Sequence, residues 1–398
     1  MNEIKKIVES KNFDAILIFV LLMAIFVPIA NYLSTDIPDH IQWIIRVNEG
    51  NASYSPHFLF FFLVNLFSFF SSNVSLMLFV ASVLLSLATV GKYLISKEVV
   101  SSSVLDIAHP YKKNIIKTLS FMLLFCFAIP DFYNFFFLKK MYLGRTPSVV
   151  WHNSTIIAVF PFALLLFWRQ LKLFDREYSS IFHKDLLIVT VLIVLNVLIK
   201  PSFIFVFIPV SVVLILKDFS IQDYKKYVIK LFPIFIGAIF ILIQYISIYN
   251  YQIGSFQAKE SSLAIAAPFD FLRHFAPGWY VPIAFFFSFT FPIATVFYYR
   301  DILKFKPFKY AFYLTFVGIV ISAFIVETGP RRFHGNLVWQ NIICAYLLML
   351  TTVTYLIPTL WSKDRFSKKN IILWSLFTLH FLSGILYLIK IYFTKSYH

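Results

Sequence analysis

Residues 13–33 read FDAILIFVLLMAIFVPIANYL, an apolar run in which Asp14 is the one charged side chain. A helix of this length spans the hydrocarbon core of a bilayer. Further apolar runs follow at roughly 56–72, 74–91, 116–131, 149–168, 185–199, 202–216, 231–249, 278–298, 309–327, 336–358 and 370–393. Because lipid cannot satisfy open backbone groups, each run is expected to be helical. The pattern predicts an all-α, polytopic helical membrane protein with about 11–13 transmembrane helices.

The composition agrees with this class. Of the 398 residues, 60% are hydrophobic and only 14% are charged, whereas soluble domains contain about a quarter charged residues. The net charge of +16 comes from Lys and Arg in short loops between apolar runs, where such residues set membrane orientation, so nucleic acid is not expected as a partner. Cys126 and Cys344 both lie inside apolar runs, which argues against a disulfide framework. Residues 1–398 are expected to form one integral membrane domain.

The distribution of Lys and Arg predicts which loops share a side of the membrane. Four loops, within 169–184, 217–230, 300–309 and 363–369, contain 16 of them, whereas the alternating segments contain 8. The basic set is assigned to the cytoplasm. The N-terminus, with Lys5, Lys6 and Lys11, is assigned there too, so the loop 34–56 is expected outside. A bacterial cytoplasmic membrane is the expected location.

One loop does not fit a simple alternation. Residues 92–117 contain five basic residues and are also predicted to be cytoplasmic, yet three apolar runs precede them. Either one run within 56–91 is not a full crossing, or a further crossing lies around 119–143. Pro130 and Asp131 interrupt that last stretch, which favours a broken or re-entrant helix there.

With this sidedness, polar residues collect on the extracytoplasmic side. The candidate site residues there are Asp36, Asp39 and His40; His152 and Asn153; Lys200; Arg273; and Glu327, Arg331, Arg332 and His334. Any one of them has a plainer interpretation, since polar residues are common at membrane interfaces. Asp36, for example, could serve only as a helix N-cap.

Together they favour a site for an anionic substrate. Lys200 lies between two apolar runs with almost no loop, where an ionisable group is costly and usually has a partner or a function. Arg331 and Arg332 can hold phosphate oxygens with paired hydrogen bonds. A carboxylate near a bound phosphate can accept the proton of an attacking hydroxyl. There is no glycine-rich phosphate loop and no HExxH metal pair in the sequence, so nucleotide-driven chemistry is not expected.

The first external loop resembles that of a known superfamily. Thr35-Asp36-Ile37-Pro38-Asp39-His40 follows the first apolar run, Glu49-Gly50 comes later, and Ser55-Pro56-His57-Phe58-Leu59 opens the next run. This order resembles the acidic pair, small-residue turn and proline-led second helix of the GT-C superfamily of integral-membrane glycosyltransferases, over roughly residues 13–91.

The resemblance implies an inverting transfer of a sugar from a polyprenyl-phosphate-linked donor to a lipid-linked glycan, polysaccharide or protein acceptor. Asp36 or Asp39 would act as the general base, or help to position the acceptor and a divalent cation such as Mg²⁺ or Mn²⁺. The two aspartates are separated by Ile37-Pro38 instead of being adjacent as is commoner in the superfamily, so the choice between them stays open. His40 or His152 would orient the acceptor or aid proton transfer.

In the same scheme, cations hold the donor phosphate. These are Arg331 and Arg332, with Lys200 or Arg273, and they would stabilise the leaving lipid phosphate. The competing interpretations are an O-antigen-type polymerase or ligase, a transporter or flippase for a lipid-linked saccharide, and an inert membrane scaffold. The external loop 249–277 is modest in length, which favours the transferase over the polymerase.

Overall fold

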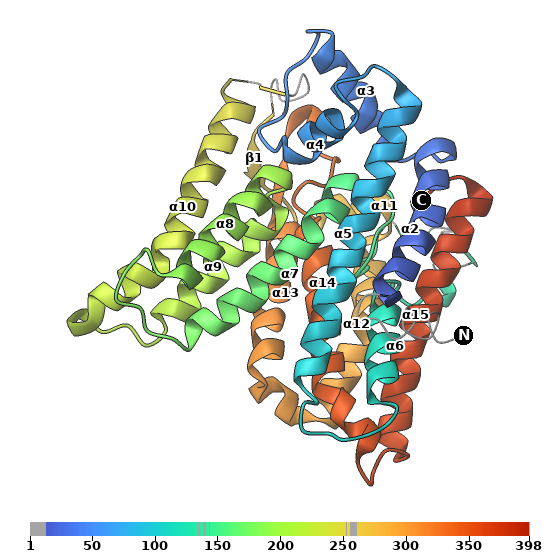
Figure 1. The fold of residues 1–398 in the computed structure, drawn as a ribbon, viewed down its shortest axis with the longest axis vertical. Coiled ribbons are helices and arrows are strands. Elements are labelled where there is room, and N and C mark those ends of the chain that lie inside the picture. The colour runs from blue at the N-terminus through green and yellow to red at the C-terminus, as the bar shows by residue number, and fades with distance from the viewer. Residues whose placement is uncertain are drawn as a thin grey trace, which may run out of the picture.

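The computed structural model describes residues 13–133, 136–137, 141–142, 144–251, 253–254 and 261–397, and these are largely α-helical (Figure 1). Lys5, Lys6 and Lys11 lie outside the described residues. Within these ranges, eight helices are long and apolar enough to cross a membrane; two of them have a short 3-10 extension at their start and one at its end. They are α2 (Phe13–Tyr32), α5 (Val74–Ser102), α7 (Ser154–Phe174), α10 (Tyr224–Tyr249), α12 (Val281–Tyr298), α13 (Lys306–Phe324), α14 (Gln340–Leu356) and α15 (Lys368–Thr394). The all-α, polytopic membrane class is therefore confirmed.

The eight long helices are fewer than the 11–13 spans expected, because four apolar runs form shorter helices. These are α4 (Leu59–Phe67), α6 (Lys112–Leu123), α8 (Lys184–Ile199) and α9 (Ser202–Leu216), with 9, 12, 16 and 15 residues. At about 1.5 Å per residue, each is shorter than a hydrocarbon core of about 30 Å. The expected number of spans exceeds the number of long helices because hydrophobicity measures how favourably a segment transfers out of water, and it does not determine where the helix within that segment ends.

The remaining elements are short and lie between these helices. They are α3 (Asp36–Asn48), α11 (Asp270–Phe275), the 3-10 turns η2 (Ile221–Asp223), η4 (Gly278–Tyr280), η5 (Arg300–Lys304), η6 (Gly329–Arg331) and η7 (Ile357–Trp361), and the strands β1 (Leu263–Ile265) and β2 (Ile325–Glu327). The two strands pair antiparallel, with Leu263 opposite Glu327. This pairing joins the chain after α10 to the chain after α13.

Helix α4 explains why residues 92–117 did not fit the alternation. It stops at Phe67, and Phe69 and Phe70 then take positive φ values of 56° and 55°, so only α5 in this stretch is long enough to cross. The far end of α5 therefore returns to the end of the molecule where α2 begins. There the Asp14 carboxylate pairs with Lys97 at 2.8 Å and with Lys117 at 3.4 Å.

Contacts between loops bring the basic segments to that same end. Lys306 pairs with Asp175, and the Lys226 ammonium lies 3.8 Å from Glu177. The rings of His109 and Trp361 lie 6.1 Å apart, which joins the turn before α6 to the turn before α15. The loops that the charge pattern groups together thus share one end of the helix bundle, opposite α3 (Figure 1).

Beyond α6 the crossing is broken, as Pro130 and Asp131 suggested. Helix α6 ends at Leu123, and residues 126–131 form no regular secondary structure. Such backbone survives inside a membrane only when protein groups satisfy its polar atoms. Helix α15 supplies them: Phe127 N–H donates to His380 O at 2.9 Å, His380 Nδ1 lies 2.6 Å from Phe127 O, and Ser383 Oγ donates to Ala128 O at 2.6 Å.

Two further residues hold this segment in place. Gly384 of α15 packs directly on it, since a Cβ there would lie 1.4 Å from Phe125 O. The buried Arg145 donates to Ile129 O at 2.7 Å and pairs with Asp131. Arg145 thus serves the fold of the broken crossing.

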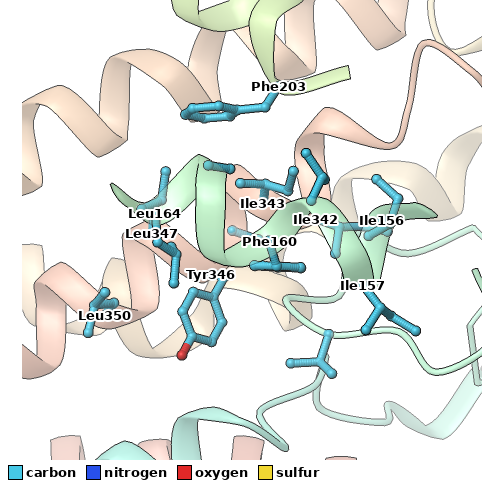
Figure 2. Packing of buried hydrophobic residues seen from close by; sticks show 14 of the residues in the cluster. Ile156, Ile157, Phe160, Leu164, Phe203, Ile342, Ile343, Tyr346, Leu347 and Leu350 are labelled. Atoms are coloured by element: carbon cyan, nitrogen blue, oxygen red, sulfur yellow. The ribbon is translucent and has the colours of Figure 1, made fainter. Parts of the chain in front are cut away.

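Helix α14 lies at the centre of the molecule. Every residue from Gln340 to Thr354 is buried, which is the pattern of a helix surrounded by others. Ile156 and Phe160 of α7 pack beside Ile343 and Tyr346 of α14 (Figure 2). This packing fixes the first turn of α7, where several of the candidate site residues lie.

Candidate functional site

Helix α3 presents Asp36 and His40 to the same neighbour. Thr35, and not Asp36, is the N-cap residue, since its side chain accepts from Ile37 N–H at 3.4 Å. The helix is amphipathic and buries three isoleucines, at positions 37, 41 and 44. Asp36 and His40 are one turn apart and therefore lie on one side of the helix. Both reach the start of α7.

The first turn of α7 receives these two side chains. Asn153 is its N-cap, accepting from Ile156 N–H at 3.0 Å through its side-chain oxygen. Its amide nitrogen donates to the Asp36 carboxylate at 2.6 Å. Ser154 Oγ lies 2.6 Å from His40 Nδ1. The capping geometry of α7 thus also orients the acid of α3.

A chain of hydrogen bonds continues from Asp36 to Lys200. Thr155 Oγ1 donates to Asn153 Oδ1 at 3.0 Å, and the Lys200 ammonium donates to Thr155 Oγ1, also at 3.0 Å. Lys200 is buried in the tight turn between α8 and α9, and its ammonium lies 5.2 Å from the centre of the Trp339 ring. The carboxylate and the ammonium are therefore held in one network without touching each other in a direct ion pair.

Lys200 also lines a cavity of about 530 Å³ between α9, α10 and α13. Its walls are mainly apolar, from residues such as Ile204, Phe205 and Ile241. The lining also contains two basic residues, Lys200 and Arg331, and one acidic residue, Glu327. His57, Tyr249 and Asn336 add polar groups that can form hydrogen bonds. The cavity therefore has an apolar body and a cationic, hydrogen-bonding margin, an arrangement suited to a ligand with a chain and a charged head.

Glu327 organises the margin on the β2 side. Its carboxylate accepts from Tyr249 OH at 2.6 Å, from Arg331 Nε at 2.7 Å and from Asn336 Nδ2 at 2.7 Å. The side chain is almost completely buried. The desolvation cost of burying this carboxylate is offset because one cation and two hydrogen-bond donors contact it. Glu327 is thus placed to orient Arg331 at the cavity.

His57 is a functional candidate that the sequence reasoning did not select. It lines the cavity, and its Nδ1 lies 2.8 Å from Ser55 Oγ. The positive charges of Lys200 and Arg331 contribute to lowering its pKa. Phe61 packs on the rings of both His40 and His57, with centroid distances of 5.0 and 6.3 Å. The available signal was a histidine at the start of an apolar run, just after the loop that contains the aspartates.

Burial dominates the protonation of this site. It raises the pKa of Asp36, although Lys200 and the Asn153 hydrogen bond oppose the rise. Burial and Lys200 together lower the pKa of His40 to about 3, and His57 is lowered to about 3 by burial, Lys200, His40 and Arg331. Burial lowers the pKa of Lys200 to about 8, with Asp36 opposing it. The two histidines are therefore neutral near pH 7, while Lys200 is largely charged.

His152 lies beside the network in an aromatic setting. Its ring stacks on Tyr397 with centroids 4.0 Å apart and meets the edge of Tyr142 at 4.7 Å. Tyr397 reaches this place because the chain after α15 returns to the start of α3, where Ser396 forms a bridge with Ser34. His152 is buried, so this part of the predicted site is packed against protein.

Four of the predicted residues lie on the surface. Asp39 is exposed, and Arg332 is exposed and pairs with Asp270 at 3.0 Å. Arg273 and His334 are also exposed. The structure therefore joins Asp36, His40 and Asn153 where α3 meets α7, with His152 alongside, and it places Lys200, Glu327 and Arg331 in the cavity lining. Asp36 is connected to the cavity only through Asn153, Thr155 and Lys200. Asp39, Arg332, Arg273 and His334 belong to neither group.

Two further observations concern metal binding and similarity to known proteins. Within the ranges that the structure describes, no group of three His, Cys, Asp or Glu residues could hold a metal ion. Comparison of the chain with protein-family models, curated proteins and solved structures found no match.

Proposed function

We propose that this protein is a membrane glycosyltransferase that moves a sugar from a polyprenyl-phosphate-linked donor to a glycan, lipid-linked or protein acceptor. The observation that carries the proposal is the hydrogen-bonded chain that links the Asp36 carboxylate, through Asn153 and Thr155, to Lys200 at the cavity margin. A candidate base and a candidate phosphate ligand are thereby held in one network. The resemblance of residues 13–91 to the GT-C superfamily points the same way.

The donor lipid fits the cavity by its chemistry. Its apolar chain would lie against α9 and α10, and its phosphate would meet Lys200 and Arg331 at the margin. A buried, cationic margin binds phosphate more strongly than exposed lysines do, because water screens it less. Glu327 holds the Arg331 side chain in position through its 2.7 Å hydrogen bond.

In the proposed reaction, the acceptor hydroxyl oxygen attacks the anomeric carbon of the donor sugar. The bond between that carbon and the phosphate oxygen breaks, and its electron pair stays on the lipid phosphate. The hydroxyl proton passes to the Asp36 carboxylate and from there to water. Lys200 and Arg331 stabilise the negative charge that grows on the departing phosphate. Attack opposite the leaving group inverts the anomeric centre. No step requires a nucleotide.

The experiment measures sugar transfer from a polyprenyl-phosphate sugar by the purified protein in lipid vesicles. Asp36→Asn should reduce the turnover rate by about 10²- to 10⁴-fold, the usual contribution of a general base. Asp39→Asn is the matched control, because Asp39 lies on the same helix but is exposed. It should retain nearly wild-type transfer. Equal activity of wild type and Asp36→Asn would refute this assignment of the base.

The same cavity would suit a transporter of lipid-linked saccharides, in which the cations bind phosphate without any bond being broken. The two functions differ in their products. A transporter moves intact donor between leaflets and releases no free polyprenyl phosphate, whereas the transferase releases it in step with the new glycoside. Donor binding and translocation without transfer, across a panel of acceptors, would replace our proposal.

A further inference from the structure

A second cavity lies at the opposite end of the molecule, among the basic loops. It measures about 660 Å³ and lies between the end of α5, the start of α6 and the turn that joins them. Four lysines line it, namely Lys97, Lys112, Lys113 and Lys117, and Glu98 is the one acidic residue of the lining. Asp14 adds a second carboxylate beside two of the lysines. The cavity therefore keeps a net positive charge.

Three of the four lysines are held in place by protein groups, which distinguishes them from side chains that merely extend into water, as the exposed Lys113 does. Lys97 and Lys117 share the Asp14 carboxylate, and their side chains are only 22% and 26% exposed. Lys112 donates to Leu105 O at 3.1 Å and to Ile107 O at 2.9 Å. Ordering them in advance removes part of the entropy cost of binding an anion.

The surroundings of the cavity are those of a membrane interface. Ile107, Ala108 and Ile116 contribute an apolar part of its lining, beside the ammonium groups. Leu105 and Tyr111, on the turn that encloses it, are 70% and 65% exposed. Large apolar side chains exposed next to a basic pocket fit contact with acyl chains on one side and with a headgroup on the other.

We propose that this cavity binds the phosphate of an anionic phospholipid headgroup from the leaflet at that end of the molecule. The phosphate would lie among Lys97, Lys113 and Lys117, and the acyl chains would run beside Leu105. The site is separate from the candidate transfer site, and its function does not depend on the glycosyltransferase proposal.

Native mass spectrometry of the purified protein, titrated with phosphatidylglycerol, tests the proposal. Replacing two lysines, with Lys113→Gln and Lys117→Gln, should weaken lipid binding by about tenfold or more. Ala108→Phe keeps every charge but adds a bulky ring to the cavity lining, and it should weaken binding as well. The matched control is Lys217→Gln with Lys225→Gln, which removes two exposed charges from another basic loop. It should bind lipid like the wild type.

Two results would overturn the proposal. In the first, the control weakens binding as much as the cavity variants do, so that only general surface charge matters. In the second, inorganic phosphate occupies the site at millimolar concentration while phosphatidylglycerol does not, so that the anion comes from solution. Thermal unfolding of each variant without lipid separates loss of binding from loss of folding.

Discussion

Two polar regions interrupt the apolar interior, and they differ in what their polar groups face. In the broken crossing after α6, backbone carbonyl groups form hydrogen bonds with the side chains of His380, Ser383 and Arg145, so other parts of the protein satisfy them. Where α3 meets α7, an equally ordered network ends at Lys200, on the margin of a cavity. A buried polar residue in a membrane protein is therefore a better guide to function when its network opens onto a space that a ligand can enter.

The largest effect is expected in the first region, from Gly384→Ala. The added Cβ would lie 1.4 Å from Phe125 O, and backbone on both sides cannot move without losing its hydrogen bonds. We expect a loss of roughly 3 kcal/mol or more in the free energy of unfolding, or failure to fold. Thermal unfolding in detergent measures it. Gly278→Ala is the control, since its Cβ would meet only the Arg273 side chain, at 3.4 Å. Equal melting temperatures for both variants would show that the close approach is not required.

A smaller effect should separate two neighbouring arginines of the second region. Arg331 lines the cavity, whereas Arg332 is exposed and pairs with Asp270. Arg331→Gln should raise KM for the polyprenyl-phosphate donor by about tenfold. Arg332→Gln should change it by less than about twofold, because exposed ion pairs contribute little. Steady-state kinetics with varied donor checks both values, and a larger effect of Arg332→Gln would contradict the assignment of the cavity.

The smallest expected effect is a few-fold change of rate with pH. Asp36 must be deprotonated to accept a proton, and burial raises its pKa, so activity should rise with pH above the usual carboxyl range. Lys200 must keep its proton, and its pKa of about 8 predicts a falling limb in the mildly alkaline range. The measurement is kcat/KM across both limbs. Lys200→Arg should remove the falling limb, because a guanidinium does not titrate there. A wild-type profile without that limb would count against Lys200 as the phosphate ligand.

Much of the architecture could be predicted from the sequence, because transfer free energy and loop charge are local properties. The long apolar runs became helices, and the basic loops share one end. The number of long helices could not be predicted. The apolar run at 56–72 contains the 9-residue α4, and its end depends on the turn at Phe69 and Phe70, which hydrophobicity does not encode.

The candidate site was predictable only in part. Lys200 could be selected because an ionisable group between two apolar runs is costly, and Asp36 and Asn153 because they lie in external segments where polar residues collect. The structure joins the three in one network. Arg331 and Arg332 could not be distinguished from the sequence, because the backbone conformation decides which of two adjacent side chains points into the cavity. His57 was overlooked because its place at the cavity depends on how α4 packs, a long-range property that no local pattern carries.

The shortness of α9 has a consequence for the lipid around the protein. Its 15 residues extend about 23 Å, against a hydrocarbon core of about 30 Å. Hydrophobic mismatch of this size makes the bilayer thin locally or the helix sit deep beneath one surface. Headgroups that move toward the membrane centre would then lie closer to the cavity that the buried Lys200 lines, at the start of α9. The phosphate of a neighbouring lipid would in this way lie at the depth of the cavity, and the lipid would not have to move out of the bilayer to reach it.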